Sequence, residues 1–201
     1  VKLREMNLVH EGSIQPAYYN EQFNAVALDR CMARAKEMIG WDEKYPFKDM
    51  GNGKVRGIGV AMAMQGSGIT ALDQAAVEIR LSDEGFYNMM IGASDMGTGC
   101  DTILAQMAAE CLECDIDQII VHGVDTDVSP YDTGSYASST TYVTGMAVVK
   151  TCETLQKKMM ALAADVLKCP EENMEFDGKK FYSLEDEKEI SLSDLATQSH
   201  L

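Results

Sequence analysis

The chain lacks the features of a membrane or secreted protein. None of its apolar runs approaches the ~20 residues that span a bilayer, and the segment Val1 to Glu5 lacks the apolar stretch of a signal peptide. We therefore expect a cytoplasmic protein with no membrane partner. Hydrophobic residues make up 46% of the 201 residues, which is enough for the core of an ordinary globular fold.

Basic residues are scarce. Only 17 Lys and Arg stand against 32 Asp and Glu, and the net charge of -15 repels phosphate backbones. This charge argues against a nucleic-acid partner. An anionic ligand would have to be held by local backbone dipoles, so glycine-rich turns that open helices are the places to look for a site.

The six cysteines lack the spacing of a zinc or iron–sulfur site. Only Cys111 and Cys114 are closely paired, and the three histidines, His10, His122 and His200, lie far apart in sequence. We interpret the pair as reduced thiols on one face of a helix and predict no metal site. A metal-binding module built on this pair is the alternative interpretation.

Hydrophobic periodicity divides the chain into two regions. Apolar residues at helical spacing predict an amphipathic helix from Gln22 to Ile39 that ends near Gly40, and residues 42–53 have the Pro and Gly of a connecting loop. Large and small residues alternate from Lys54 to Met64, which predicts a strand buried on both faces. We expect a helical lead-in and linker over about residues 1–53 and an α/β region over 54–201.

The α/β region mixes strands and helices. Residues 75–81 predict a half-buried strand with residues 86–93 as its hairpin partner, and a short strand is predicted at 119–121. One helix is predicted over about 101–113, and a long one follows residue 141 and stops before Cys169-Pro170. A hairpin around Asp177-Gly178 and a helix capped by Ser191 follow. The fold class is α+β, with mixed sheets and packed helices.

Two loops have the composition of a backbone that binds a ligand. Gly97-Thr98-Gly99 precedes the first of these helices, where glycines permit close approach and the first amides of the helix are unpaired. Residues 125–142 are rich in small hydroxyl side chains ahead of the long helix. The first loop is neither a dinucleotide fingerprint nor a P-loop. A tight turn and a solvated loop with an ordinary helix cap are the alternatives.

Several segments agree in order, spacing and residue type with one known family. The most specific of them are Met96–Gly99, Thr102, Gln106–Glu110, Asp125-Thr126 and Tyr131–Val148. Together they resemble the large, molybdopterin-binding subunit of the xanthine dehydrogenase and aldehyde oxidase family, and the similarity covers almost the whole chain. The segment Pro130–Ser138 is most similar to bacterial members, including those that act on aromatic substrates such as 4-hydroxybenzoyl-CoA.

The resemblance implies that the chain is part of the molybdenum-cofactor-binding domain of this family. Gly97, Thr98 and Gly99 would contact the pterin from one side, largely through backbone amides. Ser135, Tyr136, Ala137, Ser138, Ser139 and Thr140 would hold it from the other side. Thr98 stands where the family usually has a Gln that bonds the cofactor, so this contact would need a bridging water. Ser67 and Gly68 would border the substrate channel.

The resemblance also implies an oxidoreductase of which this chain is only a fragment. The family hydroxylates an electron-poor carbon with a molybdenum-bound hydroxide, and its base is a glutamate near the subunit's C-terminus that no segment here matches. The chain also begins without Met and stops just after a helix start. We therefore expect no catalytic residue in the fragment and no activity, nor bound cofactor, for the fragment alone.

The complete enzyme would contain molybdopterin with molybdenum, for which the cytosine dinucleotide is one candidate form. Iron–sulfur clusters and FAD would lie on other domains or subunits. The expected partners are the rest of the molybdopterin subunit, the iron–sulfur and flavin subunits, and a small aromatic or heterocyclic substrate. Two alternatives remain: a hydroxybenzoyl-CoA reductase-type member of the same family, and a noncatalytic small-molecule or metal-binding module.

Overall fold

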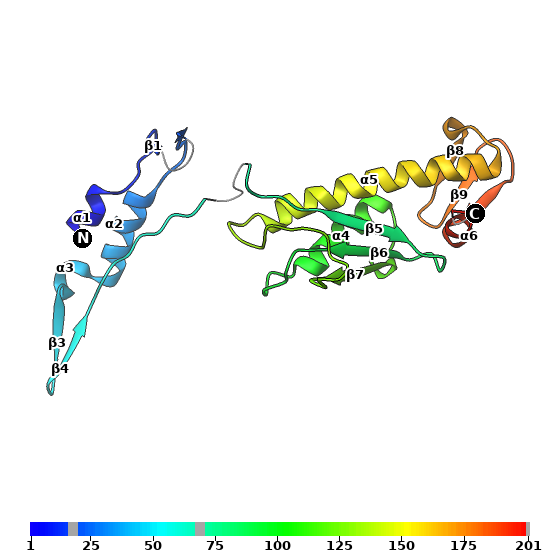
Figure 1. Cartoon of the computed structure of the whole chain (residues 1–201). Helices are drawn as coiled ribbons and strands as arrows, with labels where there is room; N and C mark the ends of the chain where they lie inside the picture. The colour runs from blue at the N-terminus through cyan, green and yellow to red at the C-terminus, as the bar shows by residue number, and fades with distance from the viewer. Residues whose placement is uncertain (16–19, 67–70, 200–201) are drawn as a thin grey trace. The chain divides into compact units, whose positions relative to one another are not determined.

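The computed structural model describes residues 1–15, 20–66 and 71–199, and the chain divides into two compact units, residues 1–66 and 67–201 (Figure 1). Ser67 and Gly68, which we expected at a substrate channel, lie outside the described residues. Among the helices described, none has both the length and the apolar character needed to cross a membrane.

The first unit is small and carries little buried surface. Its elements are α1 (Lys2–Met6), β1 (Ile14–Gln15), β2 (Glu21–Gln22), α2 (Leu28–Ile39), α3 (Trp41–Lys44), β3 (Phe47–Gly51) and β4 (Lys54–Gly57). The predicted amphipathic helix is confirmed as α2, although it begins at Leu28. It ends because Gly40 adopts the left-handed conformation at φ 66°, which costs glycine little. Trp41 is buried beside it and stacks on Tyr45 with ring centroids 4.7 Å apart.

Two predictions for this unit were wrong. Residues 42–53 are not a plain loop, because they contain part of α3 and the whole of β3. The strand expected from Lys54 to Met64 stops at Gly57, where its antiparallel pairing with β3 ends, and every residue of β3 and β4 is exposed. Alternation in a sequence indicates the preference for a strand, but burial also needs packing partners, and within its own unit this hairpin is exposed along both strands.

A three-stranded sheet organises the second unit. Its strands are β5 (Val77–Leu81), β6 (Tyr87–Ile91) and β7 (Ile119–Gly123), with β6 in the centre. The predicted hairpin is confirmed, since β5 pairs with β6 antiparallel, whereas β7 pairs with β6 in parallel. Helix α4 (Cys100–Leu112) connects β6 to β7, so these three elements form a β-α-β unit.

Helices α4 and α5 (Thr140–Leu167) pack together and against this sheet (Figure 1). Both were predicted within a few residues. One apolar face of each helix packs against Tyr87, Met89 and Ile91 of the sheet. These three residues and the apolar helix residues together form the main core. The helical members of that core include Cys100, Leu104, Ala108 and Leu112 from α4 and Val148, Cys152, Met159 and Ala163 from α5.

The C-terminal part adds a second small sheet and a helix. It contains β8 (Met174–Phe176), β9 (Lys180–Ser183), β10 (Glu189–Ser191) and α6 (Leu192–Gln198), in the sheet order β10-β9-β8. The Asp177-Gly178 hairpin is confirmed, and a Cβ at Gly178 would lie 2.2 Å from the carbonyl oxygen of Glu113. Ser191 caps α6 as predicted, because its hydroxyl accepts from the Asp194 amide at 3.1 Å. The α+β class is therefore confirmed.

Candidate ligand cradle at the carboxyl edge of the sheet

The two predicted loops follow strands that end at the same edge of the sheet. β6 and β7 are parallel, and their last residues, Ile91 and Gly123, are partners in the register. The turn 92–99 leaves β6 and the loop 124–139 leaves β7, so both start from this edge. Ligands of α/β units characteristically bind outside the carboxyl ends of parallel strands. The edge is therefore the natural place for a site.

The two loops also touch each other. The Ser135 hydroxyl donates to the Ser94 carbonyl oxygen at 3.0 Å. Gly92 allows a closer crossing, because a Cβ there would lie only 2.5 Å from the Pro130 carbonyl oxygen and 2.8 Å from the Asp132 Cβ. Segments about forty residues apart in sequence are thus held side by side.

Helices α4 and α5 run in the same direction, so both begin at this edge. Gly145, near the start of α5, lies against Met107 of α4, and further along the Gln156 side-chain amide donates to the Cys111 carbonyl at 2.6 Å. Each helix carries about half a positive charge at its N-terminus from its aligned peptide dipoles. Two such ends beside each other favour a ligand with negative charge, provided that the first amides are free.

The amides of the glycine turn are not free. The Asp95 carboxylate accepts from the Gly97 amide at 2.8 Å and from the Gly99 amide at 3.1 Å. These bonds, that from Gly97 foremost, hold the pKa of the Asp95 carboxyl below its usual value. Our expectation that these amides face an outside anion is therefore corrected: the turn already holds an anion of its own.

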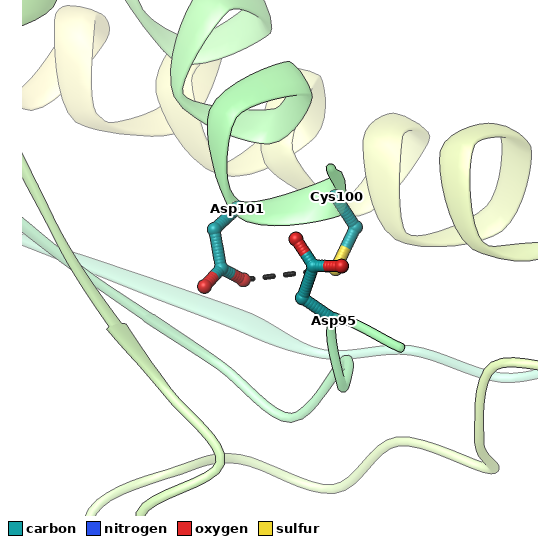
Figure 2. Close-up of side chains that lie close together, drawn as sticks. All are labelled: Asp95, Cys100 and Asp101. Atoms are coloured by element: carbon teal, nitrogen blue, oxygen red, sulfur yellow. Dashed lines mark hydrogen bonds between the residues drawn. The ribbon is translucent and has the colours of Figure 1, made fainter. Parts of the chain in front are cut away.

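Asp95 belongs to a small polar cluster at the start of α4, shown in Figure 2. Ligand atoms of Asp95, Cys100 and Asp101 all lie within 4.8 Å of one another, and the Cys100 sulfur is 3.6 Å from an Asp101 carboxylate oxygen. Burial raises the pKa of the Cys100 thiol, which therefore stays protonated near neutral pH. Two carboxylates at one helix start make this turn unattractive to a phosphate.

The turn nevertheless leaves space beside its backbone. Gly97 and Gly99 have φ angles of 100° and 73°, and a Cβ built on either would meet nothing within 4 Å. Thr98 between them is exposed. The backbone here can therefore be approached closely by a flat ligand, although two of its amides are engaged.

Strained backbone precedes α5. Ala137 and Ser138 both lie in the left-handed region, at φ 49° and 55°, which costs non-glycine residues of order 1–3 kcal/mol each and is typical of ligand-binding loops. Asp132 braces this loop, because one carboxylate oxygen accepts from the Gly134 amide at 2.7 Å and the other from the Thr144 hydroxyl at 3.1 Å. The loop is thus fixed to the helix that it precedes.

The predicted site residues of the second loop, residues 135–140, differ in their burial. Ala137 and Ser139 are buried, and the amide and the hydroxyl of Ser139 both donate to the Tyr136 carbonyl. Tyr136 and Ser138 are exposed. The first amides of α5, those of Thr140, Thr141 and Tyr142, have no acceptor in the part of the chain that the structure describes. Free donors therefore gather at the start of α5.

Asp95, Asp132 and Gly92 shape the site and were missed from the sequence. Both aspartates stand two residues before a glycine whose amide they accept. An Asp-x-Gly pattern is a known local signal for such a turn, so the two aspartates could have been found. Gly92 could not, because the need for glycine comes from a chain crossing that only the fold shows.

The paired cysteines do not form a metal site in the described part of the chain. Cys111 and Cys114 belong to no group of His, Cys, Asp or Glu ligand atoms that could hold an ion there. Burial raises the pKa of Cys114 to about 11 and that of Cys152, on the facing helix α5, to about 12. Such thiols stay protonated at pH 7, and both Cys111 and Cys114 pack against the main core. The prediction that both lie on one face of a helix was wrong for Cys114, because α4 ends at Leu112 and Glu113 adopts the left-handed conformation.

The fold and the edge define a class of protein, an α+β domain in which two helix starts and two backbone-rich loops lie at one edge of a sheet. Comparison with known families identifies the class: residues 34–201 match the molybdopterin cofactor-binding domain, and the chain belongs to this family. It is a cofactor-binding domain of the xanthine dehydrogenase-like molybdenum hydroxylases.

Individual relatives agree with this assignment. The chain is 38% identical over 141 residues to the probable hypoxanthine oxidase XdhD of Escherichia coli K12, covering 70% of this chain and 14% of that protein. It is 28% identical over 171 residues to the putative xanthine dehydrogenase molybdenum-binding subunit XdhA of the same strain, covering 83% and 23%. Carbon monoxide dehydrogenase from Oligotropha carboxidovorans superposes with a TM-score of 0.55 at 28% identity, covering 61% of this chain and 15% of that one.

Proposed function

We propose that this chain is part of the molybdopterin-binding subunit of a molybdenum hydroxylase and contacts the cofactor from two sides of the sheet edge. The observation that carries the proposal is the convergence of the turn 92–99 and the loop 124–139, joined by the bond from Ser135 to Ser94, at the starts of two parallel helices. Family membership supports the class of ligand, and this geometry supports the proposed place of binding.

The residues at the edge fit such a cofactor. Gly97 and Gly99 border open space that a flat ring can enter. The unpaired amides of Thr140, Thr141 and Tyr142 can donate to a phosphate at the positive end of α5. When bound, the cofactor supplies the molybdenum chemistry by which this family oxidises its substrates.

The two sides of the proposed cofactor site, the turn 92–99 at the start of α4 and the loop 124–139 at the start of α5, differ in charge. This difference suggests how the cofactor is oriented. Asp95 and Asp101 place carboxylates at the start of α4, where an N–H-bearing edge of a ring is favoured and a phosphate is not. The start of α5 has donors without partners. We therefore assign the phosphate end to residues 138–142 and the pterin ring to the turn 97–99, with Thr98 reaching the ring through a water in place of the family's Gln.

The whole enzyme's activity needs more than this chain. The chain spans 14% of the length of XdhD and 23% of that of XdhA. We propose that the rest of the subunit and the partner subunits supply the remaining substrate-binding residues, the glutamate base and the iron–sulfur and flavin groups. We also propose that these 201 residues alone are inactive. A CoA-thioester reductase of the same family is separated from a purine hydroxylase by activity of the complete complex.

The proposal is tested by placing a negative charge at the start of α5 in the full-length subunit. Thr141 is exposed in the first helical turn, where a carboxylate stabilises a helix but repels a phosphate. We expect Thr141→Glu to keep or raise the melting temperature of the cofactor-free subunit while the molybdenum and pterin recovered with it fall several-fold. Thr141→Gln, similar in size but neutral, is the control and should retain both.

Full cofactor content in Thr141→Glu would show that the phosphate does not bind at the start of α5. A wild-type subunit that contains zinc, or neither metal nor pterin, would contradict the proposed function itself.

A further inference from the structure

One carboxylate, that of Asp132, contacts both ends of the segment that carries the second group of predicted site residues. One of its oxygens accepts from the Gly134 amide at 2.7 Å, and the other accepts from the Thr144 hydroxyl at 3.1 Å. Residues 134–144, between these two contacts, include the predicted site residues 135–140 and the first turn of α5. All of them belong to the second unit. A single side chain therefore fixes this segment at two points.

The contact with Thr144 links the loop to the helix. The bond to Gly134 is local, of the kind that an aspartate commonly makes to an amide two residues on. Thr144, by contrast, is only 2% exposed and lies in the second turn of α5. A threonine inside a helix can donate to the carbonyl four residues earlier, but this hydroxyl donates out of the helix to Asp132. Because a buried hydroxyl needs a partner, the bond ties the loop firmly to α5.

The backbone of Asp132 is itself fastened to the sheet. Ala75 forms an isolated antiparallel bridge with Asp132, and backbone bonds of 3.0 and 3.1 Å join residues 74–76 to residues 131–133 on either side of it. Residues 74–76 lead directly into β5. The turn after β6 also packs here, because a Cβ at Gly92 would lie 2.8 Å from the Asp132 Cβ. The carboxylate therefore extends from a fixed point toward the loop and the helix.

The segment that Asp132 holds contains a strained backbone. Ala137 and Ser138 adopt the left-handed conformation at φ 49° and 55°. Non-glycine residues keep such a conformation only where the surrounding structure enforces it. The contacts of Asp132 on both sides of these residues supply part of that enforcement. The position of the first amides of α5 relative to the loop therefore depends on this side chain.

We propose that Asp132 is a positioning residue for the cofactor, which acts by holding residues 134–144 in the conformation that binds the phosphate. The inference rests on the proposed function, from which it takes the place of the phosphate at residues 138–142. Asp132 acts through the segment that it holds and makes no contact with the cofactor. Because the role depends on hydrogen-bond geometry and not on charge, a neutral side chain of the same shape should replace it.

Two substitutions in the full-length subunit test this role through the molybdenum and pterin recovered with the protein. Asp132→Ala removes both acceptors, and the cofactor content should fall at least ~10-fold, the lower end of the effect of losing residues that orient the ligands of a metal site. Asp132→Asn should retain the cofactor, because its oxygen can accept from the Gly134 amide and its NH₂ group can donate to the Thr144 hydroxyl. An equal loss in Asp132→Asn would assign the effect to charge and would overturn the proposal.

Asp177→Ala is the matched control. The Asp177 carboxylate accepts from the amides of Lys179 and Lys180 at 3.0 and 2.9 Å, in the hairpin between β8 and β9. This variant also loses two hydrogen bonds to an aspartate in a turn, but outside the proposed cofactor site. It should keep its cofactor, and a loss equal to that of Asp132→Ala would reduce the role of Asp132 to general stability.

Hydrogen exchange of the cofactor-free full-length subunit gives a readout that does not depend on the cofactor. Amides of residues 134–139 should exchange at least ~10-fold faster in Asp132→Ala than in the wild type. Thr144→Val, which removes only the bond to the helix, should also speed their exchange, whereas Asp132→Asn should not. Unchanged exchange in Asp132→Ala would overturn the proposal.

The two measurements separate this inference from the proposed function. Faster exchange together with full cofactor content in Asp132→Ala would overturn the positioning role and leave the proposed function intact. A wild-type subunit that contains no pterin would contradict the proposed function, and the positioning role would fall with it, even if Asp132→Ala still sped the exchange of the loop.

Discussion

Substitution of Gly92 by Ala would separate the two loops of the cradle. The new Cβ would lie 2.5 Å from the Pro130 carbonyl oxygen, whereas ordinary contacts begin at 3.4 Å, so the loop after β7 must move by about 0.9 Å. Overpacking of this kind costs about 1–3 kcal/mol. The displacement exceeds the ~0.5 Å within which a binding constellation must be held. We therefore expect a modest loss of stability and a large loss of cofactor.

The assay compares two quantities in the full-length subunit. Molybdenum by elemental analysis and pterin by fluorescence after oxidation report the cofactor, and thermal unfolding of the cofactor-free form reports the fold. For Gly92→Ala the melting temperature of the full-length subunit should fall by no more than about 2–4 °C for each kcal/mol lost, which is the shift of a domain of about 150–250 residues. The cofactor content should fall by far more than this destabilisation explains.

Gly145→Ala is the matched control. Its Cβ would lie 2.7 Å from the Met107 Cε, which is the far end of a flexible side chain that can swing aside. This variant should lose some stability at the α4–α5 contact but keep its cofactor, because the loops do not move. Full cofactor content in Gly92→Ala, or an equal loss in Gly145→Ala, would refute the reasoning.

Two further predictions concern charges at the site and in the core. Asp95→Ala frees the amides of the glycine turn, so phosphate should raise the melting temperature of the cofactor-free chain more than it does in the wild type. Asp95→Asn is the control, because its side-chain carbonyl can still accept from these amides, and it should respond as the wild type does. An identical response of all three proteins to phosphate would contradict the role assigned to Asp95. Burial raises the pKa of Cys114 from 9.0 to about 11 and that of Cys152 from 9.0 to about 12. Above pH 9 these thiols therefore lose their protons in the unfolded chain but keep them in the native chain. The free energy of unfolding should accordingly fall as the pH rises from about 9 toward 12. Urea unfolding at pH 8 and 10 measures this fall, which Cys152→Ala should reduce, and a stability that does not change with pH in the wild type would be evidence against it.

The sequence predicted local features of the fold well and partner-dependent ones poorly. Helix α5 and the Asp177-Gly178 hairpin follow from periodicity and turn chemistry within the segments themselves. The strand expected at residues 54–64 was wrong in its burial, because what covers a strand is decided by other parts of a protein.

The candidate site shows the same division. Its two loops could be recognised from their glycine and hydroxyl residues and from the family resemblance, and the structure brings them together at Ser94 and Ser135. That Asp95 occupies amides of the glycine turn could have been inferred from the Asp-x-Gly pattern, because the bonds are local. The need for glycine at Gly92 could not, because it comes from a crossing with the distant segment at Pro130. The parallel course of α4 and α5 likewise depends on a contact between distant segments.

A crystal structure of the full-length subunit with its cofactor bound tests the central claim most directly. The account predicts a single pterin between the turn 95–99 and the loop 134–142, with its ring beside Gly97 and Gly99 and its phosphate at the start of α5. A cofactor bound elsewhere in the subunit, or a phosphate held at the start of α4 in place of the Asp95 carboxylate, would contradict it.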